Sequence, residues 1–367
     1  MNLGKADVER YLTIIRAIGA EHQLTDLHMH PFEVVFGAGR YAENQQTTGI
    51  WSTSDLCYLP PGVGEMELTP QTDVAHDLPA ALQGRLAMLG LRRLYVHTGP
   101  RCFGDQLRIS GISRGLLLPV TRPGTNAEKD MALLARIFAD DPRFLLGYSI
   151  PVETADADIE ATLFRAIRLW GIRAVKVHPC LSAINLCTSA GVSRIEAILA
   201  AAGKTGLPVI IHGGTYPNIV EPCAPCFGLL ENMDRIDFNL TSYPVVIAHA
   251  GAFGLERQQV DSLILPRLEN LLRRYDHLFV DVSALSAEII GLVLSRIEPE
   301  RIVFGSDALY ELPWKSLIRL FIALEKAAVG PAEELLVCIG ATNSDYILRK
   351  ETKENDDVAA NQIFPVH

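Results

Sequence analysis

Eight short apolar segments, each ending in a polar or ionisable residue, limit most strongly what this chain can fold into. Each segment is continuously apolar and is bounded by glycine, proline or charge, which is typical of a strand buried on both faces of a parallel sheet. The sequence therefore predicts eight parallel strands. In chain order the segments span residues 24–30, 114–120, 143–150, 172–178, 207–212, 244–249, 277–282 and 301–307.

Helical patterns lie between these segments and give the repeat its length. The intervals from His178 to His212, on to His249, and from there to Asp281 are 34, 37 and 32 residues. A strand, a loop and a helix need about 30 residues, so the spacing predicts a (β/α)8 TIM barrel. The competing doubly wound sheet lacks a glycine-rich phosphate turn after its first strand. Amphipathic patterns predict helices over residues 7–22, 127–139, 158–170, 192–202, 261–275, 331–336 and 343–348.

The interval between the first two strands is too long for one unit, so residues 31–113 hold an insertion of loop and helix. Such an insertion at the mouth of a barrel is a candidate lid or substrate wall. One alternative places a strand at residues 91–99, which would renumber the barrel. Residues 1–23 carry an N-terminal helix and residues 351–367 form a polar tail, so we interpret residues 1–367 as a single barrel domain.

Composition narrows the choice of partners. The chain has 367 residues and a net charge of -10, which argues against nucleic acid or an anionic membrane as a partner. No apolar run approaches the roughly 18 residues of a membrane-spanning helix, and the charged N-terminus does not resemble a signal peptide. Seven scattered cysteines suit a reducing compartment. We expect a cytoplasmic protein that acts on a small molecule; a homo-oligomer stays open.

Two histidines close the first strand, in the sequence TDLHMHP. Residues two apart in a strand point to the same face, so His28 and His30 both face the barrel axis if either does. They lie at the carboxyl end of the strand, where barrel active sites are built. Because two neighbouring imidazoles cannot both be protonated cheaply, a divalent cation between them is the expected solution.

The other strand ends supply further ligand-type side chains. A single histidine in such a place is more often a core or loop residue, but five of the ten histidines lie at predicted carboxyl ends. Independent packing needs have no reason to choose that edge, so the set favours an active site. Asp281 stays open between a helix-capping and a functional role. Besides the first pair, the set comprises Lys176, His178, His212, His249 and Asp307.

The motifs DLHMHP, VKVHP, PVIIHGG, VVIAHAG, FGSDALY and NSDYILR resemble the amidohydrolase superfamily of metal-dependent barrel enzymes. The resemblance spans residues 24–350 and is greatest to the branch that includes aminocarboxymuconate-semialdehyde decarboxylase and related barrel hydrolases. It implies that four side chains bind one metal ion, usually zinc, and that His249 lies beside the metal and polarises substrate or water. The implied ligands are His28, His30, His212 and Asp307.

The resemblance leaves the number of metal ions open. Other branches of the superfamily carry a carbamylated lysine on the fourth strand, which bridges two metals, and Lys176 occupies that strand. We favour one metal, with Lys176 as a cationic contact to the substrate. His178, Arg40 and Tyr310 are the other candidate substrate contacts.

The expected activity is hydrolysis of a C–N or C–O bond in an amide, lactam or lactone by zinc-activated water, on a small and anionic substrate. Asp307 would accept the water proton, and His249 would stabilise the oxyanion. The alternative is a metal-dependent, non-oxidative decarboxylase of an aromatic or cyclic carboxylic acid. A third possibility is a binding protein whose barrel has lost its catalytic activity. Such a protein would lack some of the implied metal ligands, whereas this sequence has all of them.

Overall fold

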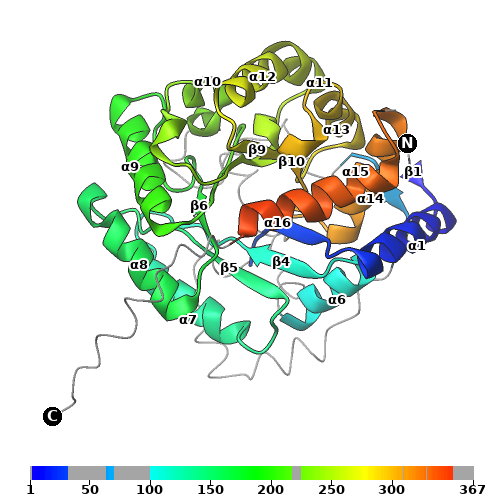
Figure 1. The fold of residues 1–367 in the computed structure, drawn as a ribbon, viewed down its shortest axis with the longest axis horizontal. Coiled ribbons are helices and arrows are strands. Elements are labelled where there is room, and N and C mark those ends of the chain that lie inside the picture. Colours follow the sequence, from blue (N-terminus) through cyan, green and yellow to red (C-terminus); the bar gives the residue numbers. More distant parts are fainter. Residues whose placement is uncertain are drawn as a thin grey trace, which may run out of the picture.

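The eight predicted strands form one parallel sheet that curls into a nearly closed barrel (Figure 1). The structure, a computed structural model, describes residues 2–31, 63–69, 100–216, 225–308, 310–327 and 329–349. Each strand pairs with the next one along the chain. In chain order the strands are β2 (Thr25–Met29), β4 (Arg114–Leu117), β5 (Phe144–Tyr148), β6 (Ala174–Val177), β7 (Val209–Ile211), β8 (Val245–Ile247), β9 (Leu278–Asp281) and β10 (Ile302–Val303).

The seam between the last and first strands completes the ring. The backbone N–H of Leu27 in β2 donates to the carbonyl of Phe304 over 3.1 Å, and Met29 forms a parallel bridge with Ala308. All eight strands lie inside the predicted segments and are shorter than them, because the segment ends turn into the loops at the barrel rims. The alternative strand at 91–99 lies outside the described residues, and β4 pairs directly with β2 as predicted.

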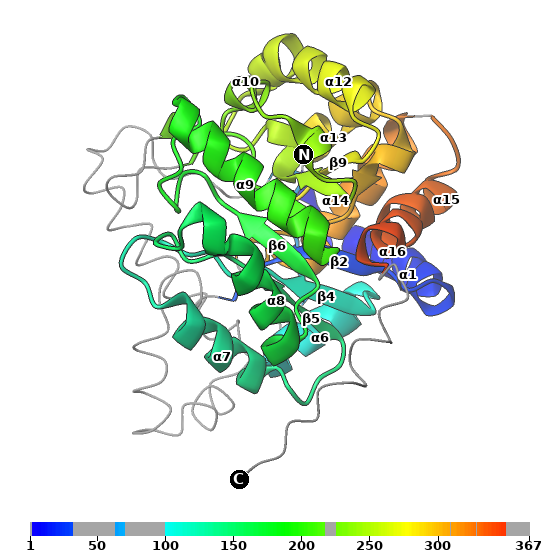
Figure 2. The same cartoon turned by 60° about the vertical axis from the view of Figure 1, so that its left-hand side comes forward.

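A ring of helices surrounds the barrel, and α7, α8 and α9 lie along one side of it in Figure 2. All seven predicted helices are confirmed, with boundaries shifted by a few residues. No helix among the described residues is long and apolar enough to cross a membrane. The main helices are α1 (Lys5–Glu21), α6 (Pro100–Ser110), α7 (Ala127–Ile137), α8 (Ile159–Trp170), α9 (Ser189–Thr205), α10 (Leu230–Met233), α11 (Arg257–Gln259), α12 (Leu265–Arg274), α13 (Ala287–Leu294), α14 (Pro313–Ala327), α15 (Ala332–Val337) and α16 (Asn343–Leu348).

Five of these helices, α6, α10, α11, α13 and α14, were not predicted. Helix α14 is the clearest case, since it is buried on nearly every side from Leu317 to Leu324. A helix covered all round carries no single apolar stripe and therefore escapes a search for amphipathic periodicity. In contrast, α1 buries one stripe that includes Val8, Leu12 and Ile15, as predicted.

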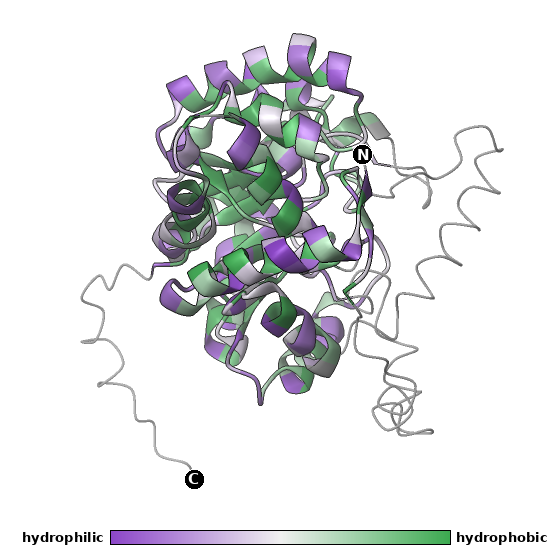
Figure 3. Ribbon diagram, turned by 90° about the vertical axis from the view of Figure 1, so that its right-hand side faces the viewer, coloured by the Kyte–Doolittle hydropathy of each residue, from purple (hydrophilic) through white to green (hydrophobic). Residues whose placement is uncertain are grey.

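The core has two layers, one between strands and helices and one inside the barrel. Alternate residues of each strand face these two layers, so the strands are apolar on both faces and appear hydrophobic at the centre of Figure 3. Ile347 and Leu348 of α16 belong to the inner layer and close the amino end of the barrel. The apolar filling of the interior therefore leaves the carboxyl end for polar side chains.

Strand periodicity explains how those polar side chains reach the interior. On β6, Ala174 belongs to the inner layer, and Lys176 and His178 follow it at steps of two residues. On β7, Ile210 is followed in the same way by His212. On these two strands the last inward-facing position is thus an ionisable one.

A buried arginine fastens the short segment 63–69 to this frame. Within it, β3 (Met66–Glu67) pairs antiparallel with β1 (Asn2–Leu3). The guanidinium of Arg319 on α14 donates to the carbonyls of Glu67 and Thr69 and forms an ion pair with Glu311, at 2.6 Å from Nη1 to Oε2. Arg319 is 2% exposed, and these hydrogen bonds and the ion pair compensate its charge inside the fold.

We expect Arg319→Ala to lower the free energy of unfolding by about 3–5 kcal/mol, because it leaves the largely buried carboxylate of Glu311 without its cation. Urea denaturation measures the change. Arg273 on α12 is exposed and provides the control, since its replacement by alanine should change stability by less than about 0.5 kcal/mol. Equal effects of the two substitutions would contradict this account of the buried ion pair.

Candidate metal centre

Three side chains from the seam of the barrel meet at its carboxyl end. His28 comes from β2, His30 follows it, and Asp307 follows β10. The Nε2 atoms of the two histidines lie 2.9 Å apart, and Oδ1 of Asp307 lies 3.6 Å from the first and 3.4 Å from the second. All three side chains are buried. The first and last strands therefore bring nitrogen and oxygen donors to one point.

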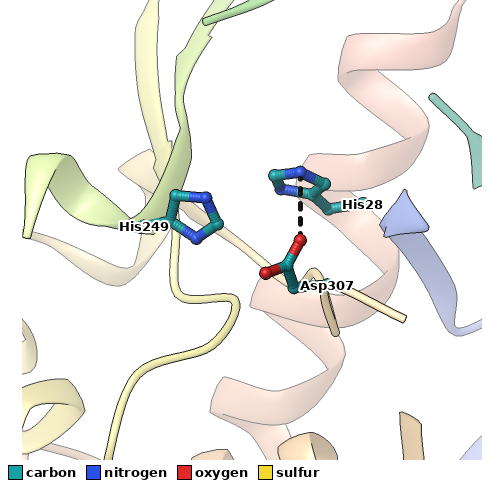
Figure 4. Close-up of side chains that lie close together, drawn as sticks. All are labelled: His28, His249 and Asp307. Atoms are coloured by element: carbon teal, nitrogen blue, oxygen red, sulfur yellow. Dashed lines mark ion pairs between the residues drawn. The ribbon is translucent and has the colours of Figure 1, made fainter. Parts of the chain in front are cut away.

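His249 joins this cluster from the other side. The ligand atoms of His28, His249 and Asp307 also lie within 4.8 Å of one another (Figure 4). His249 and Asp307 both have positive φ angles, 56° and 62°, which are strained for residues other than glycine. Backbone hydrogen bonds stabilise the strained conformation: the N–H of Asp307 donates to the carbonyl of His28 over 2.8 Å.

Hydrogen bonds fix the tautomers of the first two histidines. Nδ1 of His28 lies 2.8 Å from Oδ2 of Asp281, and Nδ1 of His30 lies 2.7 Å from the carbonyl oxygen of Leu118. A carboxylate and a carbonyl oxygen only accept, so each Nδ1 carries the ring hydrogen. In the neutral rings, each Nε2 therefore offers a lone pair.

These two lone pairs face each other at 2.9 Å with no proton between them. Such an arrangement is repulsive unless a cation lies close by, and the ammonium of Lys176, with Nζ 2.8 Å from Nε2 of His28, is one such cation. Imidazole nitrogens and a carboxylate oxygen are the donor types that zinc and related divalent ions take in proteins. The residues present fit a divalent metal.

Burial sets the charges of the site. It lowers the pKa of His28 to about 4 and that of His249 to about 3, so both rings are neutral ligands at neutral pH. Burial also lowers the pKa of Lys176 to about 8, against the attraction of Asp281 and Asp307. It raises the pKa of Asp307 to about 7, against the pull of Lys176.

His212 and His178 form a second pair beside the first. Their rings are stacked, with centroids 3.9 Å apart, and His212 lies 5.0 Å from His249 by centroid distance. Nε2 of His212 faces the carbonyl of Thr215 at 3.1 Å, which leaves Nδ1 as its ligand atom. His212 thus neighbours the cluster through His249, and its role as a metal ligand stays a prediction.

The candidate substrate contacts are distributed around this centre. Lys176 contacts His28 directly, and His178 lies in the stacked pair. The ring of Tyr310 stands edge-on to His30 with centroids 6.2 Å apart. Arg40 lies outside the described residues.

Several residues around the site were not singled out from the sequence. Phe253 and Tyr216 border the histidines, with ring centroids 4.8 Å from His249 and 5.0 Å from His178. They lie on loops, where no periodic signal exists. Ser283 could have been found, because it follows Asp281 by two residues on an inward-facing register.

A closed parallel barrel with histidine and carboxylate donors at its carboxyl end is typical of metal-dependent barrel enzymes. The family model described as Amidohydrolase matches residues 25–349. The chain therefore belongs to the amidohydrolase family, which confirms the resemblance seen in its motifs. No curated protein matches the chain significantly.

Solved structures support the fold. A TIM-barrel protein from Bordetella bronchiseptica matches with a TM-score of 0.54 and 15% identity, over 89% of this chain and 98% of that one. The 5-carboxyvanillate decarboxylase of Sphingomonas paucimobilis matches with a TM-score of 0.53 and 17% identity, over 89% and 99% of the two chains. The 5-carboxyvanillate decarboxylase of Novosphingobium aromaticivorans matches with a TM-score of 0.52 and 14% identity, over 89% of this chain and 95% of that one.

Gly305 offers a test of how tightly the cluster is built. A Cβ added there would lie 2.6 Å from Cβ of His28, which cannot rotate away. We expect Gly305→Ala to displace His28 and to weaken the binding of a divalent ion such as zinc by about tenfold or more, as measured by competition with a chelator. Gly291 on α13 has open space around its missing Cβ, so Gly291→Ala should leave zinc affinity unchanged. Wild-type affinity in Gly305→Ala would contradict the close fit.

Proposed function

We propose that the protein is a metal-dependent hydrolase that adds water to the acyl carbon of an amide, a lactam or a lactone in a small anionic substrate. One divalent ion, with zinc as the first candidate, serves as cofactor. The observation that carries the proposal is the convergence of Nε2 of His28, Nε2 of His30 and Oδ1 of Asp307 within 3.6 Å. Neutral nitrogens and a carboxylate at the mouth of a barrel suit this chemistry.

A zinc ion held by these donors would supply Lewis-acid chemistry and would lower the pKa of water to about 7. The carboxylate of Asp307 takes the proton of the attacking water and returns it to the leaving nitrogen or oxygen. His28, His30, His212 and Asp307 are the proposed ligands. Burial around them excludes bulk water and strengthens every charge interaction inside.

For His249 we propose a role different from the one that the sequence suggested, and its hydrogen bonds support this proposal. Nδ1 of His249 lies 3.0 Å from the carbonyl of Ser283 and therefore carries the ring hydrogen. Its Nε2 offers a lone pair, so the neutral ring binds the ion or receives a proton rather than donating to an oxyanion.

Two other donors suit the oxyanion better. Lys176 carries an ammonium, and Nδ1 of His178 accepts the N–H of Leu181 over 3.3 Å, which leaves Nε2–H as the donor of that ring. In the proposal, Lys176 and His178 stabilise the charge that develops on the substrate, and Tyr310 and Arg40 contact the rest of it.

We expect His28→Ala and Asp307→Ala each to abolish both bound zinc and turnover, because each removes a donor at the point of convergence. Elemental analysis gives zinc per chain, and a panel of lactones and amides reports turnover. His277 contacts the carbonyl of Phe238 next to the amino end of β9, so His277→Ala is the control and should keep its zinc.

One zinc ion per wild-type chain supports the proposed centre. Two zinc ions per chain would instead support a two-metal centre bridged by a carbamylated Lys176. A metal-free His28→Ala protein with full activity would rule the centre out.

Decarboxylation of an aromatic or cyclic carboxylic acid is the second candidate. The buried ammonium of Lys176, 2.8 Å from Nε2 of His28, is a partner for a substrate carboxylate beside the metal. Two structures that share this fold are 5-carboxyvanillate decarboxylases, one of them with manganese and 4-hydroxy-3-methoxy-5-nitrobenzoic acid. Manganese is accordingly the alternative to zinc.

Turnover in ¹⁸O-labelled water separates the two reactions. Hydrolysis predicts one labelled oxygen in the product carboxylate and no released CO₂, since water supplies the new C–O bond. Mass spectrometry of the product and a CO₂ assay measure the two quantities. Release of one CO₂ for each substrate consumed, without label in the product, would replace the hydrolase by the decarboxylase.

A further inference from the structure

We propose that Asp281, supported by Ser283, is a positioning residue that sets the tautomer of His28 and so directs the Nε2 lone pair of that ring to the metal. The proposal rests on the proposed metal centre. Asp281 ends β9 and does not belong to the group of converging donors, so its contribution passes through the histidines.

The two carboxylate oxygens of Asp281 face different groups. Oδ1 accepts the backbone N–H of His249 over 2.8 Å and that of Ser283 over 3.0 Å, and it also accepts the hydroxyl of Ser283. Oδ2 lies 2.8 Å from Nδ1 of His28. The backbone N–H groups cannot turn round, so the position of Oδ1 can only be taken by an acceptor.

Ser283 connects the same carboxylate to both rings. Its single hydroxyl hydrogen goes to Asp281, so toward the rings its Oγ can only accept. Oγ lies 2.9 Å from Nδ1 of His249 and 3.1 Å from Nδ1 of His28. Both Nδ1 atoms therefore carry hydrogen, and both Nε2 atoms are left as ligands. All four side chains are at least nine-tenths buried, so water offers no alternative partner.

This geometry makes a sharp prediction for Asp281→Asn. The amide oxygen must take the place of Oδ1, because two fixed N–H donors point there. The amide NH₂ then replaces Oδ2 and donates to Nδ1 of His28. That ring must move its hydrogen to Nε2, the atom that faces His30 and the metal. The substitution changes one atom and keeps the volume, but it turns the ligand nitrogen into a donor.

The experiment uses the full chain with ¹⁵N-labelled histidine. In the zinc-free wild type, long-range ¹H–¹⁵N spectra should show His28 as the Nδ1–H tautomer, assigned by comparison with His28→Ala. Asp281→Asn should show the Nε2–H tautomer. Its zinc affinity, measured by competition with a chelator, should fall about 10–100-fold. Ser283→Ala should keep the Nδ1–H tautomer of His28, because Asp281 is still present. Its zinc affinity should fall about tenfold, because Asp281 loses the hydrogen bond from the Ser283 hydroxyl.

Ser110→Ala is the matched control, because Ser110 is fully buried on α6 and donates to the carbonyl of Gln106. It should keep the wild-type affinity. An Asp281→Asn protein with the Nδ1–H tautomer and wild-type zinc affinity would overturn the proposal. If Asp281→Asn fails to fold, a folded Ser283→Ala protein with unchanged affinity overturns it instead. A wild type that binds neither zinc nor manganese contradicts the proposed function, whereas the tautomer spectra test the role of Asp281 independently of the metal.

Discussion

Two imidazole lone pairs pointing at each other across 2.9 Å are the constraint on which the rest of this site depends. Nδ1 of His28 and Nδ1 of His30 both face acceptors, so neither ring can supply a proton to relieve the repulsion. Burial keeps both rings neutral and so removes protonation as a solution. A cation is the remaining solution: the ammonium of Lys176 is one such cation, and the carboxylate of Asp307 is placed to bind a metal ion there.

The barrel holds this unfavourable arrangement in place. Strand periodicity delivers one ionisable side chain to the last inward position of several strands, while apolar residues below them fill the interior. The seam between β2 and β10 adds Asp307, whose left-handed backbone is fixed by the carbonyl of His28. Strain and repulsion at the mouth are thus balanced by packing beneath it, as is common at functional sites.

Much of the fold was readable because parallel strands and amphipathic helices leave periodic signals. The eight strands and the alternation of Lys176 with His178 follow from such signals. Helix α14 was missed because it is buried on all sides and has no stripe. Tyr216 and Phe253 were missed because loops have no period. The sequence could not reveal the tautomers, since these depend on acceptors such as the carbonyl of Leu118, which is distant along the chain from His30.

The most direct test of the central claim is a crystal structure of the zinc-loaded protein, with anomalous scattering recorded at the zinc edge. The account predicts one anomalous peak within about 2.2 Å of Nε2 of His28, Nε2 of His30 and a carboxylate oxygen of Asp307. Lys176 should have moved its ammonium away from His28 to make room. An anomalous map with no peak at this point, or with the two Nε2 atoms unchanged and the zinc elsewhere, would contradict it.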